Sequence, residues 1–160
     1  MVWSCLVSIL PGMAQTEKLT DYVNPFVGTD GYGNVYPGAQ IPFGGIQISP
    51  DTDSRFYDAA SGYKYNHLTL MGFSLTHLSG TGIPDLGDFL FIPGTGEMKL
   101  EPGTHEDPDQ GYRSRYSHDK EWASPNYYAV ELADYGVKAE MTSGVRSGMF
   151  RFTYSESDNA

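Results

Sequence analysis

The last third of the chain contains three successive segments in which apolar and polar residues alternate. These segments are Tyr128–Leu132, Val137–Thr142 and Phe150–Tyr154, and glycine-containing turns separate them at Asp134–Gly136 and Ser143–Gly144. A period of two is typical of strands that bury one face and expose the other. Short connections of this kind join antiparallel neighbours. The pattern therefore predicts an antiparallel meander with one face in the core.

Earlier segments carry shorter strand signals. The stretch Asp21–Pro50 is dense in glycine and proline, which excludes a helix of ordinary length. Ile46–Ser49 alternates and predicts a short strand that ends at the following proline. Phe89–Ile92 is continuously apolar and predicts a strand buried on both faces, with Glu97–Leu100 as its hairpin partner. Asp107–Lys120 has no long apolar period and is expected to be an exposed connection.

The segments between these strands lack the ten-residue helical period that crossovers in a parallel α/β fold require. A chain of 160 residues has room for one domain. We therefore predict an all-β fold, an antiparallel β-sandwich, for residues 15–160. No obvious closing element follows the last strand, and we expect the domain to be incomplete.

The first fourteen residues, Met1–Ala14, carry no charge and include the apolar run Val2–Leu10. They predict a signal peptide that is cleaved before Gln15. The protein is therefore expected to be secreted or periplasmic, with the cell surface as a further location. Cys5 is the only cysteine and lies inside this segment, so cysteine chemistry is excluded for the mature chain.

The chain has 20 acidic and 10 basic residues, a formal net charge of −10, and no run of lysine or arginine. Nucleic acid is therefore excluded as a partner, since nothing would neutralise the phosphates. An acidic balance is compatible with neutral polyols or with cations such as calcium, and equally with a solubilising surface.

A first cluster of unusual composition is the glycine-rich segment Gly28–Gly33. A nucleotide-binding loop needs its last glycine to begin a helix, whereas Val35–Pro37 follows here, so that interpretation fails. The segment is either a set of turns or a loop whose backbone amides approach a ligand hydroxyl.

A second cluster, Phe73–Asp88, combines hydroxyls, the imidazole of His77 and the carboxylates of Asp85 and Asp88. A serine hydrolase is disfavoured because no Gly-x-Ser-x-Gly motif is present, and zinc because the other histidines are scattered. The segment suits a hydroxyl-rich ligand, although a buried histidine and carboxylates that bind backbone amides would give the same pattern. The two carboxylates could also serve calcium or act as an acid and base.

A third cluster, Tyr57–Tyr65, contains three tyrosines. Aromatic faces stack on the C–H faces of sugars, but tyrosines at a spacing of two are also ordinary strand residues.

Taken in order, these segments resemble the amino-terminal domain of glycoside hydrolase family 92. The resemblance rests on Tyr22–Thr29, Tyr36–Ala39, Pro42–Gly44, Gln47–Thr52, Ser61–Tyr63, Phe73–Ser74, Thr76–Gly82, Asp85–Asp88, Ser124–Tyr128, Ala139–Thr142 and Arg146–Gly148. It covers nearly all of the chain from Asp21 to Tyr154.

The resemblance implies an exo-acting α-mannosidase, of a kind that often cuts α-1,2 links, inverts configuration and uses a calcium ion bound to the mannose hydroxyls. It implies a β-sandwich packed on an (α/α)6 barrel, with the active site between them. In the family the catalytic carboxylates and the calcium ligands belong to the barrel, so no catalytic residue and no metal ligand is expected in this chain. The expected partners are mannose-containing glycans and the barrel of the same polypeptide, and the chain alone is expected to be inactive.

The resemblance places two segments of the sandwich at the sugar, and the expected substrate-binding residues are Gly31, Tyr32, Tyr57, Asp58, His77, Ser79, Thr81 and Asp85. The chain departs from the family at Tyr32, where histidine is common. It departs again at Tyr57–Ala60, where Trp-Asp-Gly-Cys is common. Tyr57 keeps an aromatic face, but the change leaves the linkage preference open.

Two other hypotheses remain from the sequence. One is a stand-alone carbohydrate-binding β-sandwich module that uses its own aromatic loops. The other is a secreted structural β-domain in which calcium only stabilises the fold.

Overall fold

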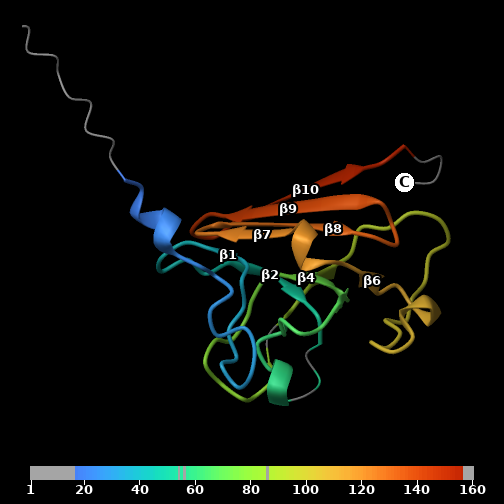
Figure 1. Cartoon of the computed structure of the whole chain (residues 1–160), viewed down its shortest axis with the longest axis horizontal. Coiled ribbons are helices and arrows are strands. Elements are labelled where there is room, and N and C mark those ends of the chain that lie inside the picture. Colours follow the sequence, from blue (N-terminus) through green and yellow to red (C-terminus); the bar gives the residue numbers. More distant parts are fainter. Residues whose placement is uncertain (1–16, 54, 56, 86, 157–160) are drawn as a thin grey trace, which may run out of the picture.

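The structure is a computed structural model that describes residues 17–53, 55, 57–85 and 87–156 (Figure 1). Its strands are β1 (Ala39–Gln40), β2 (Gln47–Asp51), β3 (Thr69–Leu70), β4 (Gly72–Ser74), β5 (Leu90–Phe91), β6 (Ser114–Arg115), β7 (Glu121–Ser124), β8 (Tyr127–Leu132), β9 (Val137–Ser143) and β10 (Gly148–Tyr154). Four short 3-10 helices accompany them in the described residues: η1 (Leu19–Tyr22), η2 (Tyr57–Ala59), η3 (Pro108–Gln110) and η4 (His118–Lys120).

The strands form two antiparallel four-stranded sheets and one small pair. One sheet has the order β1-β2-β4-β5, the second is the meander β10-β9-β8-β7, and β3 pairs with β6. Figure 1 shows the meander lying over the layer that contains β1, β2 and β4. The all-β fold and the three-stranded meander predicted from the alternation are confirmed, and β7 extends the meander by one strand.

The hydrophobic core lies between the two large sheets. Ile48 and Phe73 face it from the first sheet. Each is the immediate neighbour of an outward-facing serine, Ser49 or Ser74, and successive side chains in a strand point to opposite faces. Tyr128, Val130 and Met141 are among the buried residues that face them from the meander. The alternation that identified the strands therefore also assigned their inner faces.

The prediction for Phe89–Ile92 is wrong in its burial. Only Leu90 and Phe91 form a strand, and their side chains are 41 and 44% exposed. The reason is position: β5 is the edge of its sheet, so it has one neighbouring strand instead of two. Its expected partner, Glu97–Leu100, lies outside the strands and is exposed.

The prediction that Asp107–Lys120 is an exposed connection is also wrong in part. Ser114 lies in β6 and is completely buried, Tyr116 packs against the core, and Arg113 is only 2% exposed. The Nη1 atom of Arg113 donates hydrogen bonds to the carbonyl of Thr52 and to the Thr69 hydroxyl. Polar residues can be buried when they are hydrogen-bonded, which apolar periodicity does not reveal.

The strand predicted to end at Pro50 continues to Asp51. Proline is tolerated there because β1 pairs only with Gln47 and Ile48, so no β1–β2 hydrogen bond is lost at Pro50.

The described residues contain no helix that is long and apolar enough to cross a membrane. The predicted signal peptide, Met1–Ala14, lies outside the described residues.

Candidate functional site

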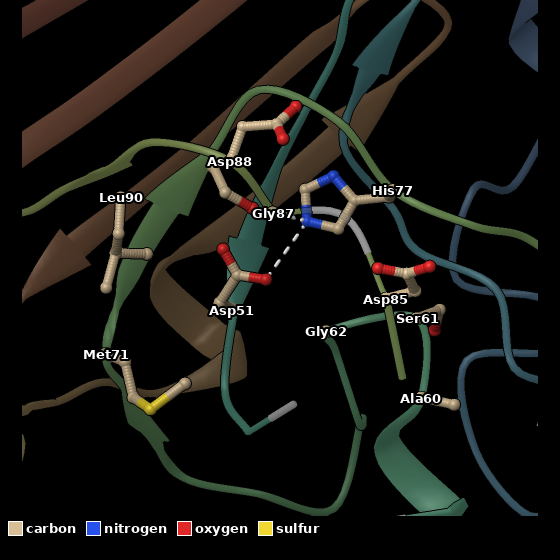
Figure 2. Close-up of a pocket in the computed structure, with 11 residues that line it drawn as sticks. Asp51, Ala60, Ser61, Gly62, Met71, His77, Asp85, Gly87, Asp88 and Leu90 are labelled. Carbon is tan, nitrogen blue, oxygen red and sulfur yellow. Dashed lines mark hydrogen bonds and ion pairs between the residues drawn. The ribbon is translucent and has the colours of Figure 1, made fainter. Parts of the chain in front are cut away.

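A polar pocket lies on the face of the first sheet that is turned away from the core. Asp51 ends β2, Ser74 ends β4 and Leu90 begins β5, and the strand register places all three on this outer face. The pocket has a volume of about 230 Å³. We call it the Asp51 pocket; it is lined by Asp51, Ala60, Ser61, Gly62, Met71, Ser74, His77, Asp85, Gly87, Asp88 and Leu90 (Figure 2).

His77 and Asp51 point toward one another in this pocket (Figure 2). His77 Nε2 lies 3.0 Å from Asp51 Oδ1 and also 3.0 Å from the Ser74 hydroxyl. On the other side of the ring, Nδ1 donates to the backbone carbonyl of Gln47 over 2.8 Å. Both ring nitrogens therefore face oxygen acceptors, which is the arrangement of a protonated imidazole.

Opposing effects act on the pKa of His77. Its burial alone would lower the pKa, but the charge of Asp51, the hydrogen bond to that carboxylate and the bond to the Gln47 carbonyl raise it above the usual value. The geometry and the direction of the pKa shift agree on a buried ion pair between His77 and Asp51.

This arrangement differs from a serine hydrolase triad. In a triad the serine and the carboxylate bind opposite nitrogens of the imidazole, so that one nitrogen can accept the serine proton. Here Ser74 and Asp51 share Nε2, and a backbone carbonyl occupies Nδ1. His77 consequently cannot act as the base for Ser74 while Asp51 orients it, and its position favours binding over nucleophilic catalysis.

The second and third clusters line this pocket, and the segment that follows the first cluster contacts both of them. The Ser61 hydroxyl donates to the Val35 carbonyl over 3.1 Å. The Gly80 amide donates to the Asn34 carbonyl over 2.6 Å. The ring of Tyr36 lies 4.9 Å from that of His77. Segment 28–36 is thus in direct contact with segments 57–65 and 73–88, although the contacting residues are 26 to 46 positions apart in the sequence.

Tyr32 and Tyr57 form an exposed aromatic pair on two of these segments. Their ring centroids are 6.2 Å apart, and the two residues are 80 and 63% exposed. The ring of Tyr57 packs on Gly82 so closely that a Cβ there would lie 2.0 Å from a ring atom. Lys64 Nζ lies 5.9 Å from the Tyr32 centroid and donates to the Gly31 carbonyl. An exposed aromatic surface of this kind can stack on a sugar ring.

The structure brings together most of the residues that the sequence analysis selected. His77 and Asp85 line the pocket, Tyr57 contacts Tyr32, and Lys64 connects Tyr32 to the Gly31 carbonyl. Ser79 is exposed in the loop that follows His77. Thr81 is partly buried and accepts a hydrogen bond from the Ile83 amide. The side chain of Asp58 lies outside the described residues.

Asp51 and Ser74 are site residues that the sequence did not predict. A signal was present for Asp51, because alternation from Ile48 places Ser49 and Asp51 together on the face opposite the core. The contact between Asp51 and His77 spans 26 residues and could not be seen in a pattern of near neighbours.

Comparisons with known proteins identify the family of the chain. The family model described as the glycosyl hydrolase family 92 N-terminal domain matches residues 22–160. A protein of Arthroderma benhamiae named uncharacterized secreted glycosidase is 30% identical over 135 residues, which are 83% of this chain and 17% of that protein.

Two solved structures from Bacteroides thetaiotaomicron are also similar. The family GH92 alpha-mannosidase BT3965 is 99% identical with a TM-score of 0.87, over 89% of this chain and 19% of that one. The family GH92 inverting mannosidase BT2199 is 28% identical with a TM-score of 0.69, over 88% of this chain and 19% of that one. This chain therefore spans about a fifth of the length of the relatives it matches, and it belongs to glycosyl hydrolase family 92, whose N-terminal domain it carries.

Proposed function

We propose that this chain is the sugar-contacting N-terminal domain of a secreted, exo-acting α-mannosidase that acts on mannose-containing glycans. The observation that carries the proposal is that three contacting segments supply both the residues of the Asp51 pocket and the exposed Tyr32–Tyr57 pair. Family membership supports the reaction class, and so do the two solved relatives, both of which are mannosidases. A preference for α-1,2 links belongs to the same proposal.

The geometry fits a ligand with both an apolar and a hydroxyl-rich side. Tyr32 and Tyr57 offer exposed ring faces, while the pocket offers the carboxylates of Asp51, Asp85 and Asp88 as hydrogen-bond acceptors. Sugars present C–H faces to aromatic rings and hydroxyl donors to carboxylates. A negatively charged ligand would be repelled by the three carboxylates, so a neutral glycan is favoured.

The domain would bind and orient the glycan, with the proton transfers assigned to residues elsewhere in the complete enzyme. We propose an inverting hydrolysis, in which one carboxylic acid protonates the leaving oxygen and a carboxylate activates water on the opposite face. The likeness to BT2199, an inverting mannosidase, supports inversion. The chain alone is therefore proposed to be inactive, and its partner is the barrel domain expected in the same polypeptide.

A calcium ion is part of the proposed enzyme, and the residues of this chain do not fit one by themselves. In the described residues, no group of three or more His, Cys, Asp or Glu side chains is arranged to hold a metal ion. Calcium takes six to eight oxygen ligands. Most of its ligands would therefore have to come from the other domain.

The proposed secretion has two supports. The relative from Arthroderma benhamiae is named a secreted glycosidase. The uncharged, apolar segment Met1–Ala14 has the character of a signal peptide.

Replacing the aromatic pair tests the proposal. In the polypeptide that the complete reading frame encodes, we expect Tyr57→Ala and Tyr32→Ala each to lower kcat/KM for α-1,2-mannobiose about two- to tenfold. Tyr22→Ala is the matched control, because Tyr22 is 71% exposed and forms no part of the pocket or the pair. An unchanged kcat/KM in both variants would show that the aromatic pair does not contact the substrate. Glycan binding by the 160-residue chain without mannose release from the complete polypeptide would instead favour the stand-alone binding module.

A further inference from the structure

The two carboxylate oxygens of Asp51 have different surroundings. Oδ1 lies 3.0 Å from His77 Nε2, whereas Oδ2 is buried and has no hydrogen-bond partner among the described residues. The Asp51 side chain is only 7% exposed. An ionised oxygen that is withdrawn from water without a donor is unfavourable, so buried carboxylates are normally satisfied on both oxygens. Oδ2 is therefore available to accept a hydrogen bond from a donor on a bound ligand.

The contacts of Oδ1 hold the carboxylate in one orientation. His77 is fixed by the Gln47 carbonyl on one side and by Ser74 and Asp51 on the other. Gly62 packs against the pair so closely that a Cβ there would lie 2.2 Å from Oδ1. The Asp51 side chain therefore has little freedom to rotate. An acceptor that is already fixed loses less conformational entropy when a ligand binds than a mobile one does.

The walls of the Asp51 pocket indicate the size and class of the ligand. Ala60, Met71 and Leu90 supply apolar contacts, and Met71 and Leu90 lie on the opposite side of Asp51 from His77 in Figure 2. A volume of about 230 Å³ is below the usual range for drug-sized ligands, roughly 300–1,000 Å³, so it suits one ring better than two. Acceptors outnumber donors, which favours a neutral ligand rich in hydroxyls.

We propose that Asp51 is a sugar-binding residue, whose Oδ2 accepts a hydrogen bond from a hydroxyl of a single hexose ring held in the Asp51 pocket. The assignment rests on the proposed function, and it adds a residue and a monosaccharide-sized subsite to it. His77 acts through Asp51 as a positioning residue, since both of its nitrogens are already engaged within the chain.

A titration of the unmodified 160-residue chain provides the direct test. Methyl α-D-mannoside is added while NMR follows the side-chain carboxyl carbon of Asp51 and the amides of Gly62 and Gly87. We expect all three signals to shift along one saturable curve. Calcium chloride alone is the second probe, because carboxylates also bind cations. A response to calcium without a response to the mannoside would overturn the proposal.

Two variants separate binding from structure. Asp51→Asn should weaken mannoside binding about ten- to a hundredfold, as expected for losing a hydrogen bond to a charged acceptor. The Asp51→Asn change also breaks the ion pair with His77. The double variant Asp51→Asn with His77→Gln is therefore included, because it replaces the ion pair by two amides. Asp53→Asn is the matched control: Asp53 is fully buried and bonded to Arg55, and it does not line the pocket.

The outcomes distinguish this assignment from the proposed function. A purely structural Asp51 predicts lower melting temperatures in both variants with unchanged affinity in the folded molecules. Shifts confined to Tyr32 and Tyr57 would overturn the Asp51 subsite and leave the sugar-contacting domain standing. A chain that shows no shift up to the solubility limit of the mannoside would also overturn the subsite, whereas the proposed function is decided separately by mannose release from the complete enzyme.

Discussion

His77 Nε2 and Asp51 Oδ1 lie 3.0 Å apart, and both side chains are more than nine-tenths buried. The pair connects the segment that follows β4, where His77 lies, to the end of β2, where Asp51 lies. Both residues line the pocket. Because its partner is a charged carboxylate, His77 has a pKa above the usual value of about 6.5. Stability should consequently depend on pH in a defined direction.

When folding raises the pKa of a histidine, the protonated form stabilises the folded chain. This stabilisation is complete at pH values below the pKa of the histidine in the unfolded chain, and it is lost as the pH rises through the pKa in the folded chain. We therefore expect the free energy of unfolding to fall as the pH rises above about 6.5. Burial raises the pKa of the neighbouring Tyr36 to about 12, so Tyr36 does not titrate in this window. Urea titrations across this range measure the effect, and the Asp51→Asn with His77→Gln variant should lack this component. An equal decline in that variant would assign the pH dependence to other groups.

Glu121 joins the meander to the loop that carries Tyr63 through buried hydrogen bonds. Its Oε1 accepts from Tyr128 over 2.5 Å and from Tyr63 over 3.0 Å, and its Oε2 lies 2.6 Å from His118 Nδ1. Tyr128→Phe keeps the ring but removes one donor to a buried charge. We expect the free energy of unfolding to fall by about 1.5–3 kcal/mol.

Tyr135→Phe is the control for Glu121, because the Tyr135 hydroxyl donates to an uncharged backbone carbonyl, that of Tyr112. Its loss should cost about 1 kcal/mol. Urea unfolding of the two variants gives the comparison, and equal losses would show that the charge of Glu121 adds nothing to the bond.

Gly62 is the glycine on which the pocket depends most. Its φ is +89°, and a Cβ would lie 2.2 Å from Asp51 Oδ1 and 3.0 Å from the His77 ring. Gly62→Ala should therefore destabilise the chain by about 2–5 kcal/mol, from backbone strain and overpacking together. Gly96→Ala is matched in φ, at +82°, but meets no atom within 4 Å, and should cost about 1–2 kcal/mol. Similar melting temperatures for the two variants would contradict the close packing at Gly62.

The edge strand β5 exposes apolar side chains. Phe89, Leu90 and Phe91 are 68, 41 and 44% exposed. Exposed apolar side chains at the edge of a sheet promote association, so the isolated chain should scatter light increasingly with concentration. Phe89→Ser should reduce the scattering, whereas Leu100→Ser, at a position that is 81% exposed elsewhere in the sequence, should not. A monodisperse wild-type chain would contradict this expectation.

Local patterns predicted the parts of the fold that depend on near neighbours. The alternation in Tyr128–Tyr154 specified the meander, because side-chain direction in a strand follows from position alone. The exposure of Phe91 could not be predicted in this way. It depends on whether β5 has one neighbour or two, which is a property of the sheet order.

The candidate site also contains residues that the sequence predicted and one that only the structure identifies. Tyr32, Tyr57 and His77 were selected from residue type and resemblance, and the structure places them on contacting segments. Asp51 was not selected, since its role comes from a contact across 26 residues and from an oxygen without a partner among the described residues. Only the folded chain reveals either property.

Release of mannose from α-1,2-mannobiose tests the central claim most directly. The 160-residue chain and the polypeptide that the complete reading frame encodes are assayed side by side, with calcium and then with a chelator. We predict no release by the chain alone and calcium-dependent release by the complete polypeptide. Release by the chain alone would place the catalytic carboxylates among Asp30, Asp58, Asp85 and Asp88. Absence of release from the complete polypeptide would contradict the assignment as an α-mannosidase.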